Sequence, residues 1–589
     1  MVMDSNNNIE QKCFIDELSR LRGSSKSAVV SADFEDAYTM YMHVDRPVQV
    51  KFEEILKSTY STNHSELILL CGSVGDGKSH MLSYCKKLYP ELMNKFYVHN
   101  DSTASLYVDK PASYTLKTIM EPFSDENIDN SDSKVILAIN LGTLSNFLDA
   151  DTYNKFGKFK EYVEKTGILS GISELDYYDE HFHSVNFADY HLYELSEKGV
   201  SSDYIQGIIK KITQKTEDNV FYNSYRNYCL NCENASICPI KANYDLLSKE
   251  SIQLGLISVL VESIVKNKLI ISTRALLNFI YEILVDVRYF DRGSLDPRKE
   301  PERMSQIDYC NALLPNTLFN KTESSEIFDA VKKVDPMRIR KENVDDFFVY
   351  FENSSDVIDI FNDCFSEYMF LLEKVKKSNF AEAALYQVKE SILRLYIRLC
   401  RLTDINNNLI SIDETYNEYM KALYYWNVGD HKALKNIYNT VSKGVLSWNG
   451  HADNNEMQLK SGSGKSKYHI IQQIKIKPLP HIVDGEQESS LHSFKEEVLL
   501  DYRSGDFSNQ EATLEVDYSL YKLLKNVVGG YIPSMNDIRI NVKCVEFINR
   551  ISKWGSKEDT LYIRDYSQKE KTEYTLLYED GLGYSFEVE

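Results

Sequence analysis

The stretch from Glu66 to Leu82 constrains the fold of this chain more than any other part of the sequence. Its residues Leu67–Cys71 are all apolar, which is typical of a strand that is buried on both faces. The next eight residues, Gly72–Ser79, match the pattern G-x-x-x-x-G-K-[ST], and a helix-length run, His80–Leu88, follows. A strand, a glycine-rich loop and a helix therefore occur in the order that a phosphate-binding loop requires.

The residue types in this loop suit the binding of a nucleotide phosphate. Glycines let the backbone take positive φ values and approach an anion, and successive N–H groups then point at phosphate oxygens. The helix N-terminus adds a partial positive charge. We expect Lys78 to contact the β- and γ-phosphates of ATP and Ser79 to bind Mg²⁺. The predicted nucleotide-binding residues are Gly72, Ser73, Val74, Gly75, Asp76, Gly77, Lys78, Ser79 and His80.

The sequence leaves open which residue would orient the Mg²⁺ ion. A second buried strand is predicted at Val135–Asn140, where a metal-orienting acid is often found, but it ends in Asn140 instead of an acidic pair. Asn140 either holds the metal site weakly or is a polar sensor of the γ-phosphate. In the second case Asp101, which ends the predicted strand Phe96–Asp101, would be the substitute acid. Because no general base follows Asn140, we expect slow hydrolysis or none.

Two other places in the chain could complete a nucleotide site. Tyr41 and His43 precede the first strand and could pack on the adenine, although ordinary packing is the simpler explanation. Ser272 can cap a helix in whose first turn Arg274 would lie. A cation is disfavoured there unless an anion is near, so Arg274 is either a γ-phosphate sensor or an ordinary surface arginine.

Three cysteines form the spacing C-x2-C-x5-C, namely Cys229, Cys232 and Cys238. A C-x2-C pair suits one face of a tetrahedral zinc site. No fourth ligand lies nearby in the sequence, so a structural zinc ion and a reduced cysteine-rich turn both stay open. The histidines that could supply a fourth ligand from a distance are His181, His183 and His191.

The charge balance limits how the chain could contact DNA. Its formal net charge is −21 and its pI is near 5.2, whereas a protein that binds duplex DNA with its whole surface is normally basic. The densest basic patch contains Arg338, Arg340 and Lys341. Most such patches are merely solvated, but a nucleic-acid contact would be expected there. We expect DNA to be reached through this patch or through partner proteins.

Length and composition indicate a folded protein with several domains. The chain has 589 residues, of which 43% are hydrophobic. No apolar run approaches about 18 residues, and no basic region followed by an apolar core opens the sequence, so neither a membrane span nor a signal peptide is expected. The ten cysteines are mostly scattered singly in apolar stretches, as in reduced cytosolic proteins. We therefore expect a cytoplasmic protein.

Strand and helix patterns alternate after the loop, which predicts an α/β fold. We expect a P-loop NTPase with a parallel sheet covered by helices, followed by a helical region and a C-terminal α+β domain. Helical periodicity runs without a visible break from Asp356 to Leu402. The expected segments are an N-terminal helical lead-in at 1–60, the P-loop NTPase core at 61–220, a cysteine-containing segment and helical lid at 221–345, a helical domain at 346–450 and the C-terminal α+β domain at 451–589.

These motifs together resemble those of the DptF family, the ATPase-like component of DNA phosphorothioation-dependent restriction systems. The resemblance rests on C-G-S-V-G-D-G-K-S-H at 71–80, the run Ala138–Leu144, D-Y-H-L-Y-E-L at 189–195 and C-P-I-x-x-N at 238–243. It implies a bacterial protein that works with DptG- and DptH-like partners to damage DNA without sulfur in its backbone, as a defence against phage. It implies nucleotide binding at Gly72, Gly75, Gly77, Lys78 and Ser79, and it supplies no nuclease site.

Two other classes of function stay open. The chain could be a nucleotide switch of the signalling-ATPase type, whose helical and C-terminal parts sense a protein ligand. It could also be a binding scaffold that keeps ATP only for structural reasons.

Overall fold

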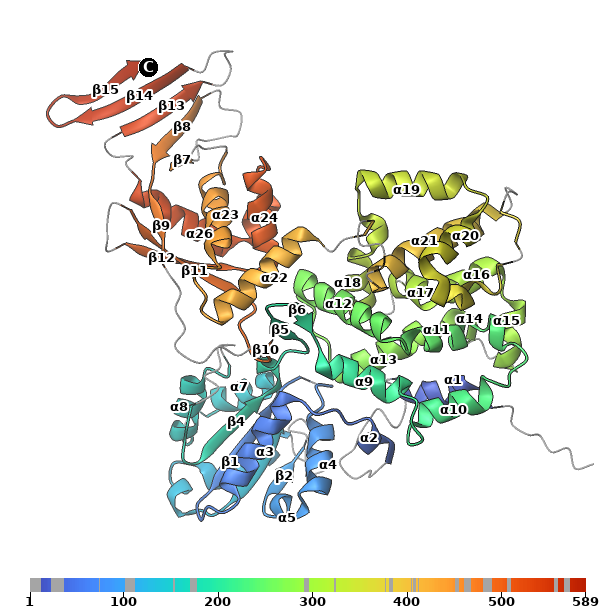
Figure 1. Cartoon of the computed structure of the whole chain (residues 1–589). Helices are drawn as coiled ribbons and strands as arrows, with labels where there is room; N and C mark the ends of the chain where they lie inside the picture. The colour runs from blue at the N-terminus through green and yellow to red at the C-terminus, as the bar shows by residue number, and fades with distance from the viewer. Residues whose placement is uncertain are drawn as a thin grey trace, which may run out of the picture. The chain divides into compact units, whose positions relative to one another are not determined.

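The computed structural model divides the chain into two compact units (Figure 1). Unit 1 comprises Met1–Glu194 and Val200–Ser411, and unit 2 comprises Leu195–Gly199 and Ile412–Glu589. The residues that the structure describes are 12–22, 37–73, 75–100, 112–151, 154–169, 177–290, 296–321, 325–376, 378–380, 385–403, 405, 409–410, 413–450, 455–459, 468–479, 490–505, 510–555, 560–565 and 572–588.

A four-stranded parallel sheet lies in unit 1. Its strands are β1 (Glu66–Cys71), β2 (Tyr97–His99), β3 (Lys134–Ile139) and β4 (Phe182–Asn186), in the order β2-β3-β1-β4. Strand β1 pairs in parallel with β3 on one side and with β4 on the other, and all six of its residues are buried. The uninterrupted apolar run in the sequence is thus the centre of the sheet, as predicted.

Helices cover both faces of this sheet because alternate side chains of each strand point to opposite faces. Ile68 and Leu70 pack with α3 (Pro47–Thr59), α4 (Lys78–Leu88) and α5 (Pro90–Met93). Leu67 and Leu69 pack with α6 (Ala112–Met120), α7 (Leu141–Asp149) and α8 (Gly157–Thr166) on the other face. The predicted α/β architecture with a parallel, helix-covered sheet is therefore confirmed.

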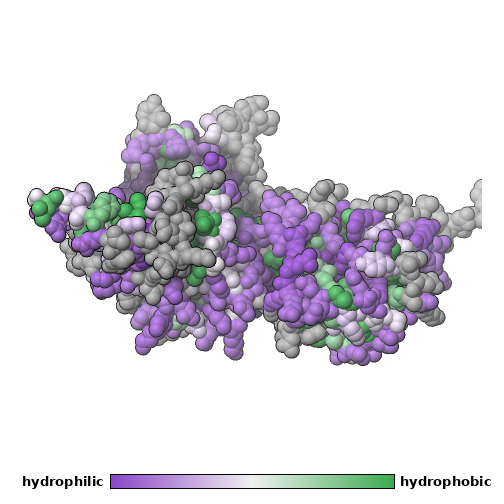
Figure 2. Space-filling view, turned by 90° about the horizontal axis from the view of Figure 1, so that it is seen from above, coloured by the Kyte–Doolittle hydropathy of each residue, from purple (hydrophilic) through white to green (hydrophobic). Residues whose placement is uncertain are grey.

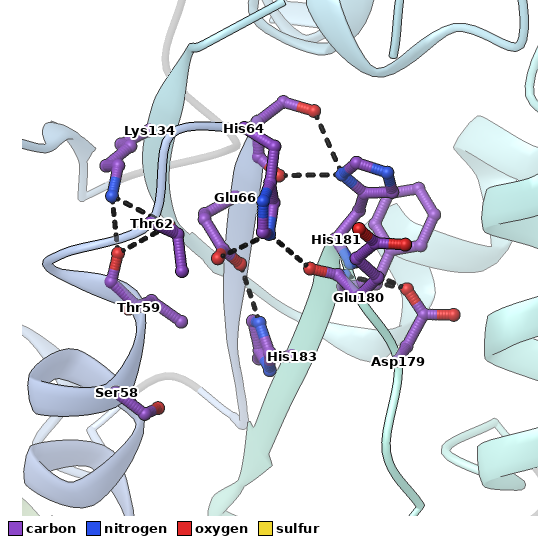
Figure 3. A network of polar contacts seen from close by, with 12 residues as sticks. Ser58, Thr59, Thr62, His64, Glu66, Lys134, Asp179, Glu180, His181 and His183 are labelled. Carbon is purple, nitrogen blue, oxygen red and sulfur yellow. Dashed lines mark hydrogen bonds and ion pairs between the residues drawn. The ribbon is translucent and has the colours of Figure 1, made fainter. Parts of the chain in front are cut away.

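A polar network closes the end of the sheet at which β1 begins (Figure 3). The carboxylate of Glu66 is buried, and its oxygens lie 2.7 Å from Nε2 of His183 and 3.1 Å from Nε2 of His64. Nδ1 of His181 lies 2.9 Å from the carbonyl oxygen of Ser65. A buried carboxylate needs such partners to offset its lost hydration. Two of the histidines considered as distant metal ligands, His181 and His183, are therefore engaged at the sheet.

The rest of unit 1 is helical. The predicted helix after Ser272 is present as α13, but the unbroken helix expected from Asp356 to Leu402 is wrong, because α20 gives way to a 3₁₀ segment at Ser366–Leu372. No glycine or proline marks that break in the sequence. The helices of unit 1 outside the sheet region are α1 (Phe14–Leu18), α2 (Ala37–Tyr41), α9 (Asp203–Thr213), α10 (Val220–Tyr228), α11 (Pro239–Leu247), α12 (Glu250–Asn267), α13 (Thr273–Leu284), α14 (Val287–Phe290), α15 (Glu300–Arg303), α16 (Gln306–Ala312), α17 (Leu314–Asn320), α18 (Glu326–Lys333), α19 (Glu342–Asn353), α20 (Val357–Phe365) and α21 (Tyr386–Thr403).

Unit 2 combines helices with antiparallel sheets, which confirms the predicted C-terminal α+β character. One sheet has the order β12-β11-β9 and another the order β15-β14-β13-β8-β7. A short pairing also joins β5 to β10 through Leu195 and Leu491. The short strands β5 (Glu194–Ser196) and β6 (Gly199–Ser201) each include residues of both units. The elements wholly within unit 2 are α22 (Glu414–Asn427), α23 (Lys435–Leu446), α24 (Tyr518–Val528), α25 (Met535–Ile540), α26 (Val542–Ile551), β7 (Glu456–Gln458), β8 (Tyr468–Gln473), β9 (Ile476–Pro478), β10 (Ser490–Leu491), β11 (Val498–Ser504), β12 (Glu511–Val516), β13 (Thr560–Asp565), β14 (Thr572–Glu579) and β15 (Gly583–Val588).

The face of the molecule shown in Figure 2 is largely hydrophilic where its residues are described. On the face shown in Figure 2, hydrophobic residues form small, separate spots among hydrophilic ones. Within the described part of the chain, no helix has both the length and the apolar character that crossing a membrane requires.

Candidate nucleotide-binding site

The glycine-rich loop joins the end of β1 to the start of α4, as its sequence pattern predicts. Gly75 and Gly77 have φ values of 92° and 100°, in the left-handed region that favours glycine. Gly77 is the N-cap residue of α4, which begins at Lys78. The loop thus lies at the carboxyl edge of a parallel sheet, where ligands bind in open α/β folds. Val74 lies outside the described residues.

The side chain of Lys78 lies across the loop. Its Nζ donates hydrogen bonds to the carbonyl oxygens of Gly72 and Ser73, both at 2.7 Å. Oδ2 of Asp76 accepts a hydrogen bond from the backbone N–H of Ser73 at 2.5 Å. A bound phosphate would compete with these carbonyl oxygens for the ammonium group, which is a strong donor without acceptor capacity.

The N-terminus of α13 packs directly on this loop, although the two are about 200 residues apart in the sequence. A Cβ atom built on Gly75 would lie 3.0 Å from Oγ of Ser272 and 3.8 Å from Cβ of Arg274. Oγ of Ser272 accepts a hydrogen bond from the N–H of Ala275, which confirms its predicted capping role. Arg274 is exposed, and no hydrogen bond or ion pair links it to another described residue.

This packing brings four sources of positive potential to one place. The N-terminal ends of α4 and α13 each carry a partial positive charge, and Lys78 and Arg274 each carry a full one. The site is therefore suited to a polyanion even though the whole chain carries a net charge of −21. Only the tertiary fold brings Arg274 to the loop. This location suits the predicted contact between Arg274 and a γ-phosphate, which stays a prediction.

Arg46 is a member of the site that the sequence does not reveal. Its Nη1 donates a hydrogen bond of 2.9 Å to the carbonyl oxygen of Asp76. Its guanidinium carbon lies 4.9 Å from the centre of the Tyr204 ring, and the hydroxyl of Tyr204 lies 2.8 Å from Oγ1 of Thr273 at the start of α13. Arg46 thus connects the loop to α9 and α13. Nothing in its sequence context distinguishes it from the other arginines of the chain.

The two residues proposed to pack on the adenine are engaged elsewhere. The hydroxyl of Tyr41 donates a 2.6 Å hydrogen bond to the carbonyl oxygen of Lys211 on α9. The ring of His43 stacks on Tyr84 with 3.4 Å between ring centres, and its Nδ1 lies 3.0 Å from Nε2 of His80. His43 therefore lies beside α4. These contacts are the ordinary packing that the sequence also allowed.

Asn140 lies at the same edge of the sheet as the loop, because β3 is next to β1. Its Oδ1 caps α7 by accepting hydrogen bonds from the backbone N–H and the hydroxyl of Thr143, at 2.8 and 2.6 Å. Both lone pairs of this oxygen are therefore in use, so a metal-holding role would require Asn140 to leave the cap. Asp101 lies outside the described residues.

Asp189 is a third candidate for the missing acid. It follows β4 at the edge of the sheet that holds the loop, and its Oδ1 accepts a 3.1 Å hydrogen bond from Nδ2 of Asn186. Burial raises the pKa of Cys71, the last residue of β1, to about 12, while Lys78 lowers it and Asp189 raises it. The charges of Lys78 and Asp189 are therefore both felt at the end of β1. Strand β4 contains the polar residues His183 and Ser184, and a 3₁₀ turn at Phe187–Asp189 follows it, so a search for an apolar strand that ends in Asp does not find this acid.

The remaining predicted residues lie away from the loop. Arg338, Arg340 and Lys341 are exposed, and Nη1 of Arg340 lies 3.6 Å from Oδ1 of Asp345. The cysteines lie around the α10–α11 connection, where Cys229 is the C-cap residue of α10 and Cys238 is the N-cap residue of α11. Among the described residues, no group of three or more His, Cys, Asp or Glu side chains is arranged to hold a single metal ion.

Comparisons of the chain with models of protein families, with curated proteins and with solved structures find no match. Its function must therefore be inferred from its own residues and their arrangement.

Proposed function

We propose that unit 1 is a P-loop nucleotide-binding domain that binds ATP with Mg²⁺ at Gly72–Ser79. The observation that supports this proposal best is the convergence of two helix N-termini, Lys78 and Arg274 on a glycine-rich loop at the carboxyl edge of the parallel sheet. Backbone N–H groups of the loop would bind the phosphates, Lys78 would reach the β- and γ-phosphates, and Ser79 would bind Mg²⁺. Arg274 would contact the γ-phosphate from α13.

ATP hydrolysis by the isolated chain should be slow. Strand β3 is followed by Asn140 and Leu141, so no carboxylate follows it directly to orient the ion or the attacking water. Asp101 and Asp189 are the acids that would have to act from β2 and β4. Binding, and not rapid turnover, is therefore the activity that the site supports best.

We further propose that this ATP-binding chain is a component of a bacterial anti-phage restriction complex that acts on DNA lacking phosphorothioate modification. The motifs at 71–80, 138–144, 189–195 and 238–243 support this proposal through their resemblance to the DptF family. The net charge of −21 supports a chain that reaches DNA through DptG- and DptH-like partners. In that arrangement the chain supplies the nucleotide-dependent step and a partner cuts the DNA.

One observation favours a nucleotide switch as the alternative. Because the start of α13 rests on the loop, a γ-phosphate that binds Arg274 would bias the position of the helical part of unit 1. Such a ligand shifts a conformational equilibrium only by the difference in its affinity for the two states. A signalling switch and a restriction component could both use this coupling.

The test of nucleotide binding is isothermal titration of Mg-ATP and Mg-ADP into the wild-type chain and three variants. We expect Lys78→Ala to weaken ATP binding by roughly 10- to 100-fold, because charged hydrogen bonds to phosphate contribute about 1.5–3 kcal/mol. Arg274→Ala should weaken ATP binding while leaving ADP binding unchanged, since only ATP has the γ-phosphate. Lys86→Ala is the matched control, because Lys86 is an exposed lysine of the same helix. Unchanged ATP affinity in Lys78→Ala would exclude the loop as the site.

A further inference from the structure

Four cysteines from two distant parts of the sequence surround one cavity in unit 1. Cys13 directly precedes α1, Cys229 follows α10, Cys232 lies in the turn, and Cys238 precedes α11. All four line the same cavity, and none forms a disulfide. Most of the other side chains around it are apolar, among them Phe14, Ile240, Phe290 and Pro301. The fourth cysteine that the spacing C-x2-C-x5-C lacks is thus supplied by the N-terminal segment.

Aromatic packing holds Cys13 in this position. The ring of Phe14, the next residue, meets Tyr225 of α10 and Tyr244 of α11 edge to face, with ring centres 5.8 and 4.9 Å apart. Phe14 and Tyr244 are both fully buried. Such aromatic contacts add stabilisation beyond the burial of area. Helix α1 is therefore fixed against the α10–α11 pair by more than the cysteines themselves.

Backbone donors surround two of the four sulfur atoms. Backbone N–H groups of Ile240 and Lys241 point at the sulfur of Cys238, and those of Phe14 and Ile15 point at the sulfur of Cys13. Hydrogen bonds of this kind stabilise the negatively charged form. Buried thiolates need a cation among them.

We propose that Cys13, Cys229, Cys232 and Cys238 are the ligands of one thiolate-bound metal centre, which fastens α1 to α10 and α11. Soft thiolate sites of four cysteines select zinc or iron–sulfur clusters. A zinc ion requires all four sulfurs at about 2.3 Å from one point, and no described group of side chains is closed around a point in that way. A [4Fe–4S] cluster binds each cysteine at a separate corner. The four thiols surround a cavity but do not converge on one point. They therefore fit a [4Fe–4S] cluster better than a single zinc ion.

This centre would be structural and independent of the nucleotide site. It would join residue 13 to residues 229–238, so that metal-binding free energy becomes folding free energy for the N-terminal segment. The proposal does not depend on ATP binding at Gly72–Ser79. Loss of the metal and loss of nucleotide affinity can therefore be measured separately.

The first test is metal and sulfide analysis of the full-length protein purified without oxygen. We expect about four iron and four acid-labile sulfide per chain, with a broad visible absorption from sulfur-to-iron charge transfer. If the protein instead contains about one zinc per chain and no iron, the four cysteines still form the centre, but they bind a single zinc ion in place of the cluster. A metal-free protein, or one with disulfides among these four cysteines, would overturn the proposal.

The second test asks whether Cys13 is a ligand. Cys13→Ser should retain metal at least tenfold less well against a chelator than the wild-type protein. Cys544→Ser, which alters a buried cysteine of unit 2, is the matched control and should retain it fully. Undiminished retention in Cys13→Ser would show that Cys13 is not a ligand.

A measurement on the wild-type chain keeps the proposal testable if Cys13→Ser does not fold. Alkylation followed by mass spectrometry should leave Cys13, Cys229, Cys232 and Cys238 protected until a chelator is added, after which all four should react together. Reaction of Cys13 while the other three stay protected would contradict its place in the centre.

Discussion

His80, the residue directly after the loop serine, has an environment that makes its charge state depend on folding. Nε2 of His80 and Nδ1 of His43 are 3.0 Å apart, so one nitrogen must donate and the other accept. Burial, assisted by the neighbouring His43, lowers the pKa of His80 to about 4. Burial also lowers the pKa of His43, against the opposing effect of Asp45. Two neutral imidazoles therefore lie beside the loop at neutral pH.

The nucleotide-free protein should lose stability as the pH falls through the range from about 6.5 to about 4. The unfolded chain binds a proton at His80 near the ordinary pKa of 6.5, whereas the folded chain binds it only near 4, so protonation favours unfolding in this window. The pKa difference corresponds to about 3 kcal/mol, and screening by solvent at this partly exposed ring reduces it. Urea unfolding of unit 1 at a series of pH values measures the slope.

His80→Gln should flatten this pH dependence because the titrating group is gone. His431→Gln, which replaces an exposed histidine of unit 2, is the control and should leave the slope of unit 1 unchanged. Equal slopes for wild-type protein and His80→Gln would show that the buried histidine pair does not govern the acid sensitivity.

At the level of secondary-structure elements, local signals were enough to predict those that build the loop. The apolar runs of β1 and β3 and the capping serine before α13 depend on neighbouring residues alone, and the structure has each of them. Arg46 and Cys13 could not be assigned, because their partners lie far away in the sequence and only tertiary packing brings them together. The break after α20 also has no local marker, since the apolar spacing continues through it.

The packing of α12 on α21 is another contact that no local pattern reveals. Gly255 lies in the second turn of α12, inside the helix, where glycine is normally unfavourable by about 1 kcal/mol relative to alanine. A Cβ atom at this position would lie 2.0 Å from the backbone carbonyl oxygen of Leu402 in α21. Backbone cannot rotate away as a side chain can. The glycine is therefore required for the two helices to approach.

Gly255→Ala should destabilise unit 1 despite the better helix propensity of alanine. The propensity gain of about 1 kcal/mol is outweighed by overpacking, which costs typically 1–3 kcal/mol and more against a backbone atom. Gly142→Ala in α7 is the matched control, because the nearest atom to its Cβ, Oδ1 of Asn140, is 3.8 Å away. Thermal unfolding of both variants should show a lower midpoint for Gly255→Ala alone. A midpoint equal to that of the wild type would mean that α12 and α21 can separate without cost.

For the molecule as a whole, the described residues of the candidate nucleotide site all belong to unit 1. Unit 2 carries its own antiparallel sheets and helices, and its chemistry is not evident from its residues. The acidic charge of the chain and the location of the candidate site suggest separate roles for unit 1 and for a partner protein. Unit 1 would respond to ATP, and the contacts with DNA would come from a basic or catalytic partner.

In cells, the proposed restriction role predicts that protection depends on the loop lysine and not on lysines in general. Phage plating on bacteria that carry the whole gene cluster should show loss of protection when this gene is deleted or replaced by Lys78→Ala, because an empty loop cannot set the conformation that the partners recognise. Lys86→Ala should protect as well as the wild type, and all three proteins should accumulate to similar levels. Pull-down of DptG- and DptH-like partners with and without ATP would locate the defect in assembly.

If the deletion strain still restricts phage, the chain is not part of the defence. If Lys78→Ala restricts fully while failing to bind ATP in titration, the nucleotide is dispensable for restriction, and a signalling or scaffold function becomes the better explanation of the loop.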